Sequence, residues 1–106
     1  MKDRTTILHR LRHADLHGTI LGRTGLAVTG AGFGGYRVSS GIATHAEALR
    51  HALLSGINLI DTSANYADGG SEELIGEVLS ELVAKEALRR DEIVLVSKGG
   101  YLQGAN

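Results

Sequence analysis

Three residues of this sequence could carry out proton transfer together: Asp61, Tyr66 and Lys98. A phenol ordinarily titrates at about pH 10, and it becomes a useful proton donor near neutral pH only where a neighbouring cation favours the phenolate. The ammonium of Lys98 could be that cation, and the carboxylate of Asp61 could hold it charged and oriented. The three side chains therefore form a candidate acid–base site if the fold brings them together.

Apolar runs precede two of these residues and predict how they are positioned. A largely apolar run at residues 57–60 ends at Asp61, and a second at residues 93–96 leads to Lys98. Such runs indicate strands buried on both faces, and Tyr66 lies in the polar loop after the first one. Parallel strands align their carboxyl ends at one edge of a sheet, where ligands bind in such folds. We therefore expect the three side chains to converge at that edge.

Two helical patterns separate the strands. Thr44 and Glu47 have the spacing of a capping box, which predicts a helix over about residues 44–55 that stops at Gly56. A second helix is expected to open at residues 69–71. Its apolar residues recur at helical intervals, and they are Leu74, Ile75, Val78, Leu79, Leu82 and Val83.

The start of the sequence predicts a β-hairpin. Residues 19–21 and 26–29 are strand-like, and they flank a four-residue connection, 22–25, with glycine at both ends. The whole order is then hairpin, strand, helix, strand, helix, strand. This alternation predicts an α/β fold with a parallel sheet, because parallel neighbours need a crossover and antiparallel ones do not.

A glycine-rich stretch offers a competing interpretation. Gly30, Gly32 and Gly35 match the G-x-G-x-x-G pattern of dinucleotide-binding Rossmann folds. In that fold the last glycine already opens the helix that holds the pyrophosphate, whereas residues 36–41 here separate Gly35 from any helical signal. The spacing therefore disfavours the Rossmann interpretation. The glycines instead indicate that the backbone closely approaches a neighbour or a ligand.

Composition excludes several classes of partner. The chain has 106 residues, and its 11 basic and 12 acidic residues give a formal charge of −1, which predicts no binding to nucleic acid or to anionic membranes. It has no cysteine, so neither a disulfide nor a thiolate metal site is available. No apolar run approaches the length of a membrane span. The default expectation is a cytoplasmic protein.

The N-terminal extension, residues 1–18, contains a row of histidines. His9, His13 and His17 would share one face of a helix, where they could in principle bind a metal ion. No carboxylate partner completes the pattern. We interpret the row as a solvated face and predict no metal site.

Several blocks of the sequence resemble the aldo-keto reductase family. They are LGRTGL at 21–26, GFGGYR at 32–37, GINLIDTSANYADGGSEELIG at 56–76 and VLVSKGG at 94–100. The resemblance covers about residues 19–106 and implies the N-terminal part of a single (β/α)8 TIM barrel domain: its hairpin, its first three strands and two helices. It also implies an oxidoreductase that uses NADPH or NADH to interconvert aldehydes, ketones or sugars with alcohols.

The same resemblance assigns roles to individual residues. The catalytic Asp, Tyr and Lys of the family fall on Asp61, Tyr66 and Lys98. Tyr66 would protonate the carbonyl oxygen while the nicotinamide delivers hydride to carbon, Lys98 would tune Tyr66, and Asp61 would support Lys98. The cofactor-binding residues that it implies are Gly35, Tyr36, Arg37 and Asp61.

One departure from the family pattern keeps an alternative open. The family's catalytic histidine ends the next barrel strand, and none of the five histidines here matches its context. A complete barrel takes about 250 residues, far more than this sequence supplies. Either the residues are the N-terminal part of a longer enzyme, or they form a non-catalytic fragment that acts as a binding or assembly module. The substrate, the choice between NADPH and NADH, and the presence of a homo-oligomer stay open.

Overall fold

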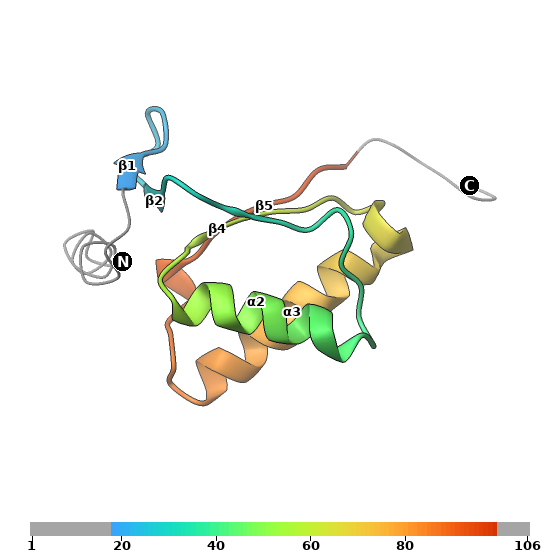
Figure 1. Ribbon diagram of the computed structural model, residues 1–106. Coiled ribbons are helices and arrows are strands. Elements are labelled where there is room, and N and C mark those ends of the chain that lie inside the picture. The colour runs from blue at the N-terminus through green and yellow to red at the C-terminus, as the bar shows by residue number, and fades with distance from the viewer. Residues whose placement is uncertain (1–17, 100–106) are drawn as a thin grey trace.

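The structure, a computed structural model, describes residues 18–99 and begins with a hairpin (Figure 1). Strand β1 (Gly18–Ile20) pairs antiparallel with β2 (Ala27–Thr29). The connection turns tightly at Gly22 and Gly25, whose φ angles of 51° and 77° lie in the left-handed region that glycine adopts without steric cost. The predicted hairpin is confirmed.

A parallel sheet with two crossover helices follows. Its strands, in spatial order, are β3 (Phe33–Gly34), β4 (Leu59–Asp61) and β5 (Val94–Val96). The helices are α2 (Ala43–Leu54) and α3 (Gly70–Ala84), and two short 3₁₀ turns are η1 (Tyr66–Gly69) and η2 (Arg90–Glu92). The predicted order of α/β elements is confirmed. The three strands form an open sheet, so the described residues do not close a barrel.

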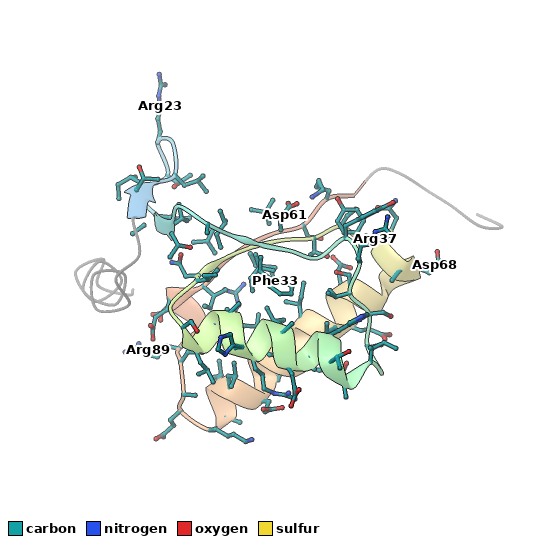
Figure 2. All side chains as sticks on the ribbon, viewed as in Figure 1. Arg23, Phe33, Arg37, Asp61, Asp68 and Arg89 are labelled. Carbon is teal, nitrogen blue, oxygen red and sulfur yellow. The ribbon has the colours of Figure 1, made fainter. Side chains whose placement is uncertain are left out.

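Both helices pack against the same face of the sheet (Figure 1). The register aligns Phe33, Ile60 and Leu95 across the three strands, and these side chains belong to the core that the helices cover. Figure 2 shows Phe33 on the helix side of the sheet. The buried residues of this core are Leu49, Leu53, Ile60, Leu74, Ile75, Val78, Leu79, Leu82, Leu88 and Ile93. Removing this apolar surface from water provides the main force that holds the helices on the strands.

The opposite face of the sheet is open, which corrects one prediction. In β4 only Ile60 is buried, Leu59 is half-buried and Asp61 is exposed, while Val96 of β5 is 38% exposed. The prediction that both strands are buried on both faces is wrong for the described residues. The physical reason is that α2 and α3 lie on one side, and no other described element covers the far side.

For helix α2, the predicted C-terminal stop is confirmed and the predicted N-terminal cap is not. Helix α2 begins at Ala43, and its N-cap residue Ile42 makes no side-chain capping bond, so the predicted Thr44 capping box is wrong. The preceding loop is fixed differently, because the Ser39 N–H donates to Nδ1 of His45 at 3.1 Å. The predicted stop at Gly56 is confirmed, since Gly56 has a φ of 108° just after the helix.

The structure also excludes the Rossmann interpretation of the glycines. Strand β3 lies inside the Gly30–Gly35 motif, and α2 does not begin until Ala43, so the motif does not form a turn from strand to helix. Two of its glycines are needed for close packing. A Cβ on Gly32 would lie 3.1 Å from the Leu59 carbonyl oxygen, and one on Gly35 would lie 2.7 Å from Oγ of Ser71.

Candidate active site

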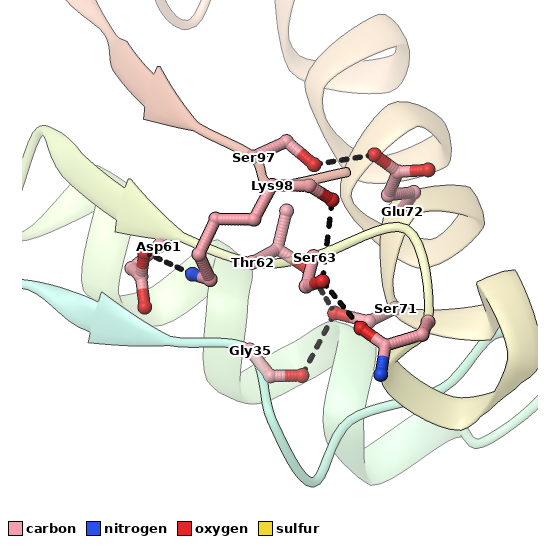
Figure 3. A network of polar contacts seen from close by, with 9 residues as sticks. Gly35, Asp61, Thr62, Ser63, Ser71, Glu72, Ser97 and Lys98 are labelled. Carbon is pink, nitrogen blue, oxygen red and sulfur yellow. Dashed lines mark hydrogen bonds and ion pairs between the residues drawn. The ribbon is translucent and has the colours of Figure 1, made fainter. Parts of the chain in front are cut away.

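Asp61 and Lys98 meet at the carboxyl edge of the sheet. Asp61 is the last residue of β4, and Lys98 follows β5 by two positions. Figure 2 places Asp61 on the side of the strands away from the helices. The Lys98 Nζ lies 2.7 Å from Oδ1 of Asp61, and the side chains are 46% and 55% exposed (Figure 3). The convergence predicted for these two residues is therefore present.

The Asp61 carboxylate changes the electrostatics of the lysine. Its hydrogen bond raises the pKa of Lys98 above the ordinary value of 10.5, against the opposing effect of partial desolvation. The charge of Asp61 and smaller interactions with Tyr66 act in the same direction as the hydrogen bond. Lys98 is thus held as an ammonium.

Tyr66 lies next to this ion pair. It opens the 3₁₀ turn η1, and its ring centroid is 5.2 Å from Nζ of Lys98, within the range of a cation–π contact. The next two residues, Ala67 and Asp68, have φ angles of 53° and 51°, which non-glycine residues rarely adopt. This sharp turn returns the chain into α3 immediately after the tyrosine. All three predicted catalytic side chains therefore lie together.

The loop that contains Tyr66 is attached to the end of β5 by backbone hydrogen bonds. The Thr62 N–H donates to the Val96 carbonyl at 2.8 Å, and the Ala64 N–H donates to the Lys98 carbonyl at 2.9 Å. The Ser63 hydroxyl donates to the same Lys98 carbonyl at 3.2 Å (Figure 3). The parallel pairing thus continues past both strands, so the backbone of Lys98 is anchored although its side chain is half exposed.

The loop after β3 adds an aromatic and a cationic side chain. The Tyr36 ring packs edge-on against the Tyr66 ring with centroids 5.1 Å apart, and the Arg37 guanidinium carbon lies 5.5 Å from the Tyr36 centroid. Arg37, Tyr36, Tyr66 and Lys98 therefore form a continuous row, in which two contacting rings lie between two cations. Tyr36 remains 64% exposed, so a ligand can still reach it.

The residues beside Asp61 suit the nicotinamide riboside end of a cofactor. Gly34 pairs with Asp61 across the sheet, and among residues 18–99 no atom lies within 4 Å of the place where a Gly34 Cβ would stand. This open surface can accept a flat ring, the Asp61 carboxylate can accept hydrogen bonds from sugar hydroxyls, and the exposed Tyr36 ring offers a stacking face. The donor set and the space therefore fit this part of the cofactor.

Sequence reasoning missed a group of hydroxyl residues behind the site. Thr62, Ser63 and Ser71 are buried, and each hydrogen-bonds to a loop or side chain that borders the site (Figure 3). Ser97 donates to the carboxylate of Glu72 at 2.5 Å. The sequence pattern does not predict these hydrogen bonds, since serine and threonine are common wherever loops meet helices.

The described part of the chain contains neither a cluster of metal ligands nor a membrane-spanning helix. Residues 18–99 contain no cluster of three or more potential metal ligands, and the row of His9, His13 and His17 lies outside these residues. Within the same range, neither helix has the length and apolar character that crossing a bilayer requires.

Comparison with known proteins identifies the family. Residues 30–106 match the model of the aldo/keto reductase family, which is most of the chain. The chain belongs to the aldo/keto reductase family. The resemblance inferred from the sequence blocks is thus confirmed, although the family model begins after the hairpin.

The chain is also similar to individual reductases. The chain is 38% identical over 91 residues to 6-dehydroglucose reductase of Novosphingobium aromaticivorans, an alignment that covers 77% of this chain. Among solved structures it is similar to the holo form of aldo-keto reductase AKR11C1 from Bacillus halodurans, with 28% identity, 80% coverage of this chain and a TM-score of 0.68. It is also similar to the thermostable aldo-keto reductase Tm1743 in complex with epalrestat, with 29% identity, 77% coverage and a TM-score of 0.65.

The chain spans only part of the length of these relatives. It covers 29% of 6-dehydroglucose reductase, 26% of AKR11C1 and 30% of Tm1743. The part matched by the family model, residues 30–106, contains the three strands of the parallel sheet and the carboxyl edge described above. The activity of the whole protein is therefore a matter for proposal.

Proposed function

We propose that this chain carries the proton-transfer residues of an NAD(P)H-dependent oxidoreductase that interconverts carbonyl compounds and alcohols. In this proposal residues 19–106 are the N-terminal part of a single (β/α)8 barrel domain, preceded by the extension at residues 1–18. The observation that carries the proposal is the position of the Lys98 ammonium, which lies 2.7 Å from the Asp61 carboxylate and 5.2 Å from the Tyr66 ring centroid.

The roles of the three residues follow from their charges. Tyr66 donates its hydroxyl proton to the oxygen of the substrate carbonyl during reduction, and it accepts a proton during alcohol oxidation. The Lys98 ammonium stabilises the phenolate that forms on Tyr66, and Asp61 keeps the ammonium charged and in place. A bound nicotinamide cofactor supplies the hydride that adds to the carbonyl carbon. Solvent then returns a proton to the phenolate.

Cofactor binding is assigned to the loop after β3 and to Asp61. Gly35, Tyr36 and Arg37 border the open surface at Gly34, and Asp61 can accept hydrogen bonds from a ribose. The similarity to AKR11C1, which was solved in a holo form, supports this assignment. The cofactor is NADPH or NADH. The substrate is a small aldehyde, ketone or sugar, and the similarity to 6-dehydroglucose reductase supports the sugar class.

Replacing Tyr66 by phenylalanine in the full-length protein tests the proposal. The variant keeps the ring that packs on Tyr36 but loses the proton donor, so turnover should fall by at least about 10²-fold. Cofactor affinity, measured by quenching of nicotinamide fluorescence, should stay within about twofold of wild type, because a phenyl ring preserves the packing. Undiminished turnover in Tyr66→Phe would refute the assignment.

A second candidate is a non-catalytic binding or assembly module. An apolar groove of about 580 Å³ between α3 and β5 favours it, because this groove lies open beside the last strand that the structure describes. A wild-type protein that binds neither NADPH nor NADH, and that reduces no aldehyde, ketone or sugar, would favour this candidate over the oxidoreductase.

A further inference from the structure

A pair of buried hydroxyls connects three elements behind the candidate active site. The Thr62 Oγ1 and Ser71 Oγ are 2.6 Å apart, and the Ser71 hydroxyl donates to the Gly35 carbonyl at 2.7 Å (Figure 3). Thr62 follows β4, Ser71 lies in the first turn of α3, and Gly35 follows β3. Their exposed fractions are 1% for Thr62 and 0% for Ser71, so water does not compete for these bonds.

The direction of this chain of hydrogen bonds follows from proton counting. A carbonyl oxygen can only accept, so the single hydroxyl proton of Ser71 is committed to Gly35. Ser71 must then accept from Thr62, and Thr62 must be the donor in their contact. The order is therefore Thr62 to Ser71 to Gly35, and loss of the Ser71 hydroxyl would leave both of its partners buried without this bond.

Gly35 is held from both sides. Its N–H donates to the Asp61 carbonyl at 2.8 Å, while its own carbonyl accepts from Ser71. A Cβ on Gly35 would lie 2.7 Å from Oγ of Ser71 and 3.1 Å from Oγ1 of Thr62. The glycine is thus required by the hydroxyl pair itself. Because Gly35 is fixed, the next residue, Tyr36, is directed onto the ring of Tyr66.

We propose that Thr62 and Ser71 are positioning residues that hold Gly35 and Tyr36 in register with Tyr66 and Asp61. They touch neither substrate nor cofactor, and they act through the loop after β3. This inference rests on the proposed function, because Tyr36 and Gly35 are there assigned to the cofactor and Tyr66 to proton transfer. Its consequence is that two hydroxyls buried behind the site set both cofactor affinity and the rate of hydride transfer.

Four substitutions in the full-length protein test this role. Ser71→Ala removes both hydrogen bonds, Thr62→Val removes the one that Ser71 accepts, and Thr62→Ser keeps that donor as a conservative rescue. Thr29→Val is the matched control. Thr29 is also buried, at 2% exposure, and its hydroxyl donates to the Ala31 carbonyl at 2.5 Å, but it lies in β2 near the opposite end of the sheet. Thr62→Val preserves side-chain shape, so it provides a folded variant even if Ser71→Ala does not fold.

Three readouts separate positioning from general stability. Amide hydrogen exchange of residues 33–42 in the cofactor-free protein reports the loop directly, and the dissociation constant for NADPH and the single-turnover rate report the site. We expect Ser71→Ala and Thr62→Val to speed exchange in this segment and to weaken NADPH binding and single-turnover reduction by about tenfold. Thr62→Ser should stay within about twofold of wild type, and Thr29→Val should lower the melting temperature while leaving all three readouts unchanged.

Two results would overturn the inference. In one, Thr62→Val and Thr29→Val lose a similar amount of melting temperature, and amide exchange in residues 33–42 is no faster in Thr62→Val than in Thr29→Val. The other is a Thr62→Ser variant as impaired as Thr62→Val. If the wild-type protein binds no cofactor, the proposed function fails, whereas the exchange measurement still decides whether the two hydroxyls position the loop.

Discussion

The ammonium of Lys98 has two partners with different chemical consequences. The Asp61 carboxylate favours the charged lysine, and the Tyr66 ring lies where that charge would stabilise a phenolate. Both side chains of the ion pair are about half exposed, and such pairs contribute little to folding stability. The pair is therefore better explained by its effect on proton transfer than by any effect on the fold.

The raised pKa of Lys98 predicts how Asp61→Asn changes the pH profile. Lys98 must stay protonated to stabilise the phenolate, so activity is lost as the pH rises through the pKa of Lys98. Asp61 raises that pKa, mainly through its hydrogen bond. In Asp61→Asn the pKa falls, and the alkaline decline of kcat/KM should begin at a lower pH than in wild type. The profile of the full-length enzyme, measured by cofactor absorbance, tests this.

A matched control makes this shift interpretable. Asp91→Asn removes another aspartate that pairs with a cation, Arg89 at 3.5 Å, in η2 near the start of β5. It should leave the alkaline limb where it is in wild type. An Asp61→Asn profile whose alkaline limb coincides with that of Asp91→Asn would show that Asp61 does not control the charge of Lys98.

The sequence allowed some of these residues to be predicted. Asp61 ends one apolar run and Lys98 follows another by two positions, and parallel strands bring such ends together, so their contact could be predicted from pattern alone. The contribution of Thr62 and Ser71 could not, because it depends on three segments that meet only in the folded chain. The sequence showed Ser71 only as a polar residue where a helix opens.

Among the elements, the two helices are joined by a charged pair as well as by apolar packing. The Arg50 guanidinium of α2 makes two hydrogen bonds to the Glu81 carboxylate of α3, Nε to Oε2 at 2.8 Å and Nη2 to Oε1 at 2.9 Å. This two-pronged geometry fixes the relative position of the helices more strongly than a single contact would. The hydrogen bond to Arg50 lowers the pKa of Glu81 below its ordinary 4.5.

The lowered pKa predicts a pH-dependent stability effect of Glu81→Gln. A carboxylate whose pKa is lower in the folded state stabilises that state above its ordinary pKa, and the contribution is lost as the pH falls through the folded-state value. Glu81→Gln should therefore lower the melting temperature at pH 7, and the difference from wild type should shrink below about pH 4. Thermal unfolding at both pH values measures this.

Glu77→Gln supplies the control for the helix pair. It removes a carboxylate one turn earlier on α3, and Glu77 makes no ion pair with any residue of 18–99. Its melting temperature should match wild type at pH 7. An equal loss in both variants would mean that charge on the helix, rather than the contact with Arg50, is responsible.

The helix boundaries show where local sequence rules are reliable. Gly56 was predicted as a stop because a left-handed residue is needed after α2, and that requirement is local. The capping box at Thr44 failed because the start of α2 is set by non-local contacts of the preceding loop. In particular, the Ser40 N–H donates to the Gly70 carbonyl at 3.0 Å, which ties this loop to the start of α3.

At the scale of the whole molecule, the sheet and α3 leave apolar surface uncovered. The groove of about 580 Å³ between α3 and β5 is lined by the buried side chains of Ile75 and Leu79, by the partly buried Leu95, and by Val83, which is 37% exposed. The apolar runs at β4 and β5 are typical of strands buried on both faces, which is why such burial was predicted, but the described residues leave one face open. The residue types of a strand show whether its faces are suited to burial, but the neighbouring elements of the fold determine whether those faces are buried.

The open groove predicts self-association of the isolated 106-residue chain. Exposed contiguous apolar surface binds hydrophobic dyes and favours aggregation. Val83 is 37% exposed in the groove, so Val83→Glu should weaken both dye binding and self-association measured by sedimentation velocity, with little cost to the core. Leu54→Glu is the control, since Leu54 is 54% exposed on α2 outside the groove. A monomeric chain that binds no dye would mean that this surface is covered.

The most direct test of the central claim is a double-mutant cycle on single-turnover carbonyl reduction by the full-length enzyme. The account predicts that Tyr66→Phe and Lys98→Met each slow the step by at least about 10²-fold, and that the double variant is no slower than Tyr66→Phe alone. The reason is that Lys98 acts through the phenolate of Tyr66, which the phenylalanine cannot form. Losses that multiply in the double variant would contradict the account, because they would show that the two residues act independently.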